Sequence, residues 1–178
     1  MSSVQAVVTE CDFPSQSLMD RRWVEAAYFC DSYRFPIRSR AETPIGIFHA
    51  VLAHHPWWIK AALIIRNRLA ALCGLAAPSS SAVLRPAIRE SYRVGETIGV
   101  WPIFALTEAE LVAGRDNKHL DFRLSVLKET GGAMPSAVIS TVCVVHNVFG
   151  KIYLFLVVPF HKWGVRWLIS KAVAAGRL

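Results

Sequence analysis

The sequence predicts an α+β domain in which a curved antiparallel sheet wraps around a long, kinked C-terminal helix. Three observations predict this class. Apolar residues recur at helical spacing around 44–73 and again after Asn147, whereas residues 96–145 alternate with the two-residue period of strands. Connections between the strand-like segments are short, which favours antiparallel neighbours, and strands and helices do not alternate along the chain as in βαβ folds; no internal repeat occurs. We therefore take 23–178 as a single domain that follows an N-terminal extension, 1–22.

The first predicted elements are a strand and two short helices. The aromatic-rich segment 23–35 alternates in part and predicts an edge strand. Thr43 and Pro44 supply an N-cap followed by a proline in the first turn, so a helix is expected to begin there. Pro56 interrupts this helix and opens a second one, over about 57–73, that ends at Gly74.

The second half of the chain predicts a meander of strands and a final helix. The strands are expected over 96–104, 110–115, 118–128 and 137–145, with a turn at 130–132. Asn147 can cap a helix that runs through Ser170 or beyond, with a kink at Pro159. The space between a bent sheet and such a helix often holds a ligand, and the apolar content of 53% supplies residues to line it.

Composition excludes several classes of function. The net charge is +7, but the basic residues are scattered and accompany no nucleic-acid-binding motif, so no nucleic-acid partner is expected. No segment is expected to span a membrane. No nucleotide-binding glycine motif and no metal-ligand spacing occur, so no cofactor and no metal are expected. Dispersed cysteines without a CxxC pair and an N-terminus without a secretory signal favour a cytoplasmic protein.

The most informative polar residues lie in the strand predicted over 118–128. Alternation places His119, Asp121 and Arg123 on one face and apolar residues on the other. Asp121 can then interact with both neighbours, and Arg123 can grip a carboxylate or phosphate. The pattern has two interpretations: a polar stripe that faces into an apolar pocket, or a solvent-facing row of compensating charges. His146, at the end of the next strand, joins this face only in one of two possible registers.

Three strings carry a resemblance to a known family: His119-Leu120-Asp121-Phe122-Arg123, His146-Asn147, and Val158-Pro159-Phe160-His161. Over about 23–175 the chain resembles an uncharacterised bacterial domain family, found alone or fused behind Rossmann dehydrogenase-like domains. That family is similar to the START/Bet v 1-like helix-grip (SRPBCC) superfamily, whose members hold hydrophobic molecules between sheet and C-terminal helix. The resemblance implies a pocket and six or seven strands, so 84–93 or the N-terminal region must add to the strands expected above.

Three functional hypotheses follow. The first is a domain that binds a small hydrophobic molecule, with ligand-binding residues His119, Asp121, Arg123, His146, Trp101 and Tyr153. The second is a cyclase, isomerase or lyase with Asp121 or His119 as general base. The third is an interaction module that docks on an oxidoreductase or an anionic membrane surface through the basic last helix. Lys162, Arg166 and Ser170 recur there at helical spacing, which is also typical of a solvated face.

Overall fold

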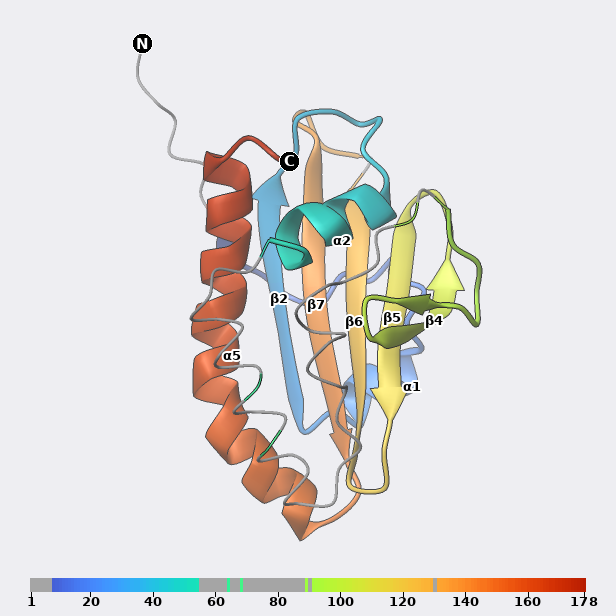
Figure 1. Ribbon diagram of the computed structural model, residues 1–178, viewed down its shortest axis with the longest axis vertical. Helices are drawn as coiled ribbons and strands as arrows, with labels where there is room; N and C mark the ends of the chain where they lie inside the picture. Colours follow the sequence, from blue (N-terminus) through green and yellow to red (C-terminus); the bar gives the residue numbers. More distant parts are fainter. Residues whose placement is uncertain (1–7, 55–63, 65–67, 69–88, 90, 130) are drawn as a thin grey trace.

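A computed structural model describes residues 8–54, 64, 68, 89, 91–129 and 131–178. Seven antiparallel strands form one sheet in the order β1-β2-β7-β6-β5-β4-β3 (Figure 1). The elements, in chain order, are β1 (Thr9–Glu10), α1 (Arg21–Glu25), β2 (Phe29–Pro36), α2 (Pro44–Leu52), β3 (Thr97–Ile98), β4 (Trp101–Leu106), β5 (Glu110–Asp116), β6 (Leu120–Glu129), β7 (Ser136–Val145) and α5 (Val148–Ala174).

The α+β class, the antiparallel sheet and the long C-terminal helix are confirmed, an arrangement consistent with a helix grip. Three details differ from the expectations. Segment 23–35 is divided between α1 and β2, and β2 is an inner strand because the two residues of β1 pair with its outer edge. The strand expected over 96–104 is split into β3 and β4 at Gly99, whose φ of +60° makes a turn. The helix expected over 57–73 lies outside the described residues.

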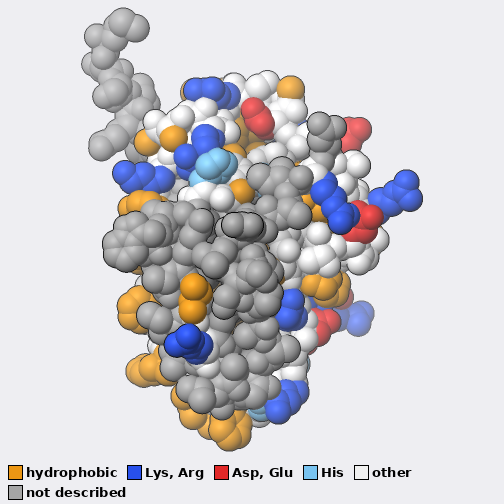
Figure 2. Space-filling view, viewed as in Figure 1, with side chains coloured by type: hydrophobic (Ala, Val, Ile, Leu, Met, Phe, Trp, Pro, Cys, Tyr) orange, Lys and Arg blue, Asp and Glu red, His pale blue; other side chains and the backbone are white. Residues whose placement is uncertain are grey.

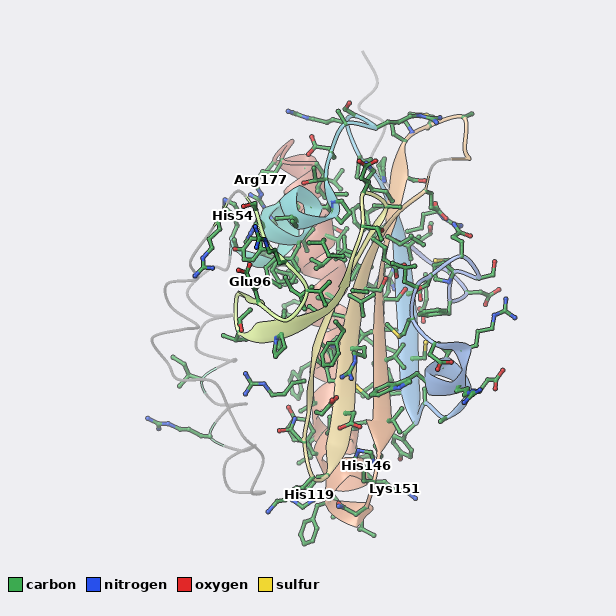
Figure 3. All side chains as sticks on the ribbon, turned by 90° about the vertical axis from the view of Figure 1, so that its right-hand side faces the viewer. His54, Glu96, His119, His146, Lys151 and Arg177 are labelled. Carbon is green, nitrogen blue, oxygen red and sulfur yellow. The ribbon has the colours of Figure 1, made fainter. Side chains whose placement is uncertain are left out.

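The two faces of the sheet are covered by different elements. Figures 1 and 3 show α2 and α5 on one face and α1 on the other. The main core lies on the first face, where Ile47 and Val51 of α2 and Ile169 of α5 pack against the sheet. A smaller cluster on the second face joins Met19 and Trp23 to the strands. We call these the α5 face and the α1 face.

Buried polar groups hold the N-terminal segment onto the α1 face. Glu110 is fully buried and accepts hydrogen bonds from Ser17 Oγ at 2.6 Å, Leu18 N at 2.5 Å and Ser125 Oγ at 2.5 Å. Three hydrogen bonds to this carboxylate offset much of the free energy that its burial costs. This bonding fixes the segment before α1 against the centre of the sheet.

The long helix α5 begins at the predicted N-cap, since Asn147 Oδ1 accepts a hydrogen bond from Gly150 N. It continues through Pro159 and bows along the sheet rather than breaking (Figure 1). The expectation of no membrane-spanning segment needs correction in one respect, because α5 is long and apolar enough to cross a membrane by length and composition. Its inner face, however, is part of the protein core, where Leu168, Ile169 and Ala172 are buried.

Candidate functional site

The expected polar stripe does not lie between the sheet and the long helix. Phe122 and Leu124 of β6 pack on the α5 face, so the alternate residues Asp121 and Arg123 lie on the α1 face. The alternation within β6 is as predicted, but the polar residues lie on the face of the sheet that α5 does not cover. The large apolar residues of β6 are needed to complete the core beneath α2 and α5, which sends the charged residues to the opposite side.

Arg123 is held by protein groups on that face. Its Nη1 donates to Asp116 Oδ1 at 2.5 Å and to the carbonyl oxygen of Phe122 at 3.0 Å. The guanidinium carbon lies 4.2 Å from the centre of the Trp23 ring and 3.6 Å from that of Phe104. Stacking on the rings of Trp23 and Phe104 and the ion pair to Asp116 hold α1 against strands β4, β5 and β6 of the sheet, which is a structural role.

The register places His146 on the same face as Asp121, because Asp121 pairs with Val144. His146 Nε2 lies 2.9 Å from Asp121 Oδ2, and Asn117 N donates to Asp121 Oδ1 at 3.1 Å. His119 lies in the turn before β6 rather than in the strand, with Nδ1 3.0 Å from Asn147 Oδ1. Figure 3 shows both histidines at the end of the sheet where α5 begins. The enzymatic hypothesis based on Asp121 or His119 stays a prediction.

The two remaining expected ligand-binding residues lie on the α5 face. The Trp101 ring packs 5.9 Å from the Phe48 ring and 5.6 Å from the Phe122 ring, measured between centroids. Tyr153 is buried on the inner face of α5 beside Leu120 and Cys143. The structure therefore separates Asp121, Arg123 and His146 on the α1 face from Trp101 and Tyr153 on the α5 face, with His119 in the turn at the end of the sheet.

A different polar cluster lies between the sheet and α5. Asp31 and Tyr33 of β2 alternate with Ser32 and thus share the α5 face. Thr141 of β7 is the direct cross-strand partner of Asp31. His161 reaches this group from α5, and its ring packs edge-on against Phe29 at 5.5 Å. We call these four residues, Asp31, Tyr33, Thr141 and His161, the helix-side cluster.

The helix-side cluster is buried and incompletely hydrogen-bonded. The Asp31 side chain is only 1% exposed, and His161 Nε2 lies 3.4 Å from both of its oxygens. Within the described part of the chain, Asp31 Oδ2, Tyr33 OH and Thr141 Oγ1 are buried without a hydrogen-bond partner. Burial, together with the negative charge of Asp31, raises the pKa of Tyr33, so its hydroxyl stays protonated and can donate.

Sequence reasoning missed this cluster although two signals were present. The string FCDSYRF over 29–35 alternates, and its odd positions combine three aromatic residues with Asp31 on one face. His161 belongs to the string Val158-Pro159-Phe160-His161, which carries part of the family resemblance. An acid inside an aromatic face indicates a polar group that the fold buries.

Comparison with known proteins gives a family and no activity. Residues 23–168 match the model of DUF2867, which is described as a protein of unknown function. The chain belongs to the DUF2867 family. No curated protein matches this DUF2867 domain in sequence. A solved structure, that of CalU16 from Micromonospora echinospora, is 12% identical with a TM-score of 0.31, over 83% of this chain and 88% of that chain.

Proposed function

We propose that this DUF2867 domain binds a small, largely apolar molecule between the sheet and α5. The observation that carries the proposal is a patch of three buried polar atoms on the α5 face, Asp31 Oδ2, Tyr33 OH and Thr141 Oγ1, whose geometric hydrogen bonding is incomplete among the described residues, although Tyr33 also interacts with Asp31 and His161 lies 3.4 Å from Asp31 Oδ2. Buried polar groups in folded proteins are almost always hydrogen-bonded, and each unpaired one costs free energy. A ligand group that hydrogen-bonds to these atoms offsets that cost.

The chemistry of the cluster defines the ligand class. Asp31 and Thr141 are cross-strand partners and Tyr33 is two residues along the same face, so one ligand group can reach all three. The carboxylate of Asp31 accepts hydrogen bonds and repels an anion, whereas the two hydroxyls can donate. The ligand group is therefore a hydroxyl, amide or amine that donates to Asp31. Apolar neighbours such as Phe29, Ile139 and Cys143 surround the cluster and suit an apolar body.

This proposal replaces the expected orienting role of Arg123. A ligand with an acidic oxygen would have suited a guanidinium, but that group is committed to Asp116 on the α1 face. Among the described residues, the side chain that lies beside Asp31 and can form a cation is His161, and the charge of Arg166 also acts on Tyr33. The ligand is accordingly neutral or cationic at the group that enters the cluster.

Native mass spectrometry of the freshly purified protein tests the proposal. We expect a retained small molecule in the wild-type protein, and its loss from the double variant Tyr33→Phe with Thr141→Val. Asp121→Asn is the matched control, because Asp121 is a polar strand residue on the α1 face. Retention of the molecule by the double variant, or its loss from the control as well, would overturn the assignment to the helix-side cluster. Absence of any molecule bound to the wild-type protein would overturn the proposed function.

A further inference from the structure

The face of α5 that points away from the sheet carries large, exposed apolar side chains. Phe155 and Phe160 are 78% and 77% exposed. The other large apolar residues of this face are each more than half exposed: Val148, Phe149, Ile152, Leu156 and Trp163. In Figure 2 hydrophobic side chains gather along the lower left edge of the molecule, over α5. We call these seven residues the outer stripe.

The outer stripe is continuous along the helix. Phe149, Ile152, Leu156, Phe160 and Trp163 follow one another at spacings of three or four residues, which places them on one side. From Val148 to Trp163 the stripe is roughly 22 Å long at the α-helical rise per residue. An exposed apolar band of this length is unusual on a monomeric soluble protein and indicates a surface that contacts another apolar phase.

The charges of α5 are all of one sign. The helix contains no Asp or Glu and carries four Lys or Arg residues: Lys151, Lys162, Arg166 and Lys171. Lys151, Lys162 and Arg166 are separated by eleven and four residues, so they lie on one flank of the outer stripe, where Lys162 Nζ also pairs with Glu10 of β1 at 3.4 Å and remains 45% exposed. Phenylalanine and tryptophan beside exposed lysine and arginine are the composition of helices that lie in the interface of anionic membranes.

We propose that α5 lies in the interface of an anionic lipid bilayer, with the outer stripe in the acyl boundary and the three flanking cations at the headgroups. The helix lies on the membrane and does not cross it. Crossing would expose its inner face, where Leu168, Ile169 and Ala172 are packed into the core of the domain. Hydrophobic length alone, which α5 satisfies, therefore does not make it a span. This inference is independent of the ligand site on the opposite face of the helix.

Co-sedimentation with vesicles tests the inference in the full chain. The probes are vesicles of phosphatidylcholine mixed with phosphatidylglycerol, and vesicles of phosphatidylcholine alone. We expect binding to the anionic vesicles that weakens as salt is added. Replacing one flanking cation by a neutral residue, as in Lys151→Gln or Arg166→Gln, should weaken binding about fivefold. The double variant Phe155→Asp with Phe160→Asp should abolish it.

Met134→Asp is the matched control, since Met134 is 73% exposed and lies in the turn between β6 and β7, outside α5. Circular dichroism and thermal unfolding establish that each variant is folded. Binding that the α5 variants lose and the control keeps supports the inference. Absence of wild-type binding, or equal loss in the control, would overturn it. A dimer in size-exclusion chromatography that the same α5 variants dissociate would also overturn it, because a second copy would then cover the stripe.

Discussion

Replacing Thr141 by valine should make the ligand-free protein more stable, although most buried substitutions destabilise. Thr141 is buried, and its Oγ1 has no hydrogen-bond partner in the described part of the chain. Valine keeps the shape and the β-branching while it removes the unpaired hydroxyl. An unsatisfied buried hydroxyl costs about 1–3 kcal/mol, so the free energy of unfolding should rise by about 1 kcal/mol or more. In a chain of this size, that corresponds to a rise in Tm of about 2–4 °C.

Urea unfolding of protein freed of any bound molecule measures the effect. We expect a higher midpoint with an unchanged dependence on urea. Ser140→Ala is the matched control: Ser140 is the adjacent strand residue, and its hydroxyl lies 2.8 Å from Ser32 Oγ on the other face. That variant should lose about 1 kcal/mol. If Thr141→Val were destabilised to the same extent as Ser140→Ala, Thr141 would have a protein partner, and the reasoning that assigns its hydroxyl to a ligand would be refuted.

Three further predictions concern the rest of the domain. Glu110→Ala removes the acceptor shared by one buried donor, Ser125 Oγ, and two partly buried donors, and it should lower the free energy of unfolding by about 2 kcal/mol, measured in urea; an unchanged midpoint would contradict the anchoring role. Burial lowers the pKa of His49, so this residue contributes to stability above the ordinary histidine pKa of about 6.5, and the contribution is lost as the pH falls to the lower folded-state pKa. The Tm of His49→Phe should therefore fall less than the wild-type Tm over this pH range. Parallel Tm–pH profiles of the two proteins would contradict this expectation. Asn147→Ala removes the α5 N-cap and should cost about 1 kcal/mol by the same urea assay, while a loss below a few tenths would indicate that another group caps the helix.

Sequence periodicity predicted most of the elements because their signals are local. The strands β5, β6 and β7 and the cap at Asn147 follow from alternation and from one side-chain oxygen. The alternation in β6 was also sufficient to separate Asp121 and Arg123 from their apolar neighbours. Which of the two faces meets α5 depends on the packing of distant elements, and a single strand carries no information about it.

The helix-side cluster needed long-range pairing that the sequence does not display. Asp31 and Thr141 become neighbours only because β2 pairs with β7 across more than a hundred residues. His161 joins them only through the path of α5 over that strand pair. The same reasoning explains His146, whose approach to Asp121 follows from the β6–β7 register and was undetermined from the connecting segment alone.

A crystal structure of the protein as purified, at a resolution that defines ordered water, would show whether the helix-side cluster holds a ligand. We predict density for a non-protein molecule between the sheet and α5, with a polar atom within hydrogen-bond distance of Asp31 Oδ2 and of at least one of Tyr33 OH and Thr141 Oγ1. Bonding of these three atoms only to groups of the chain itself or to water would rule out the proposed ligand site.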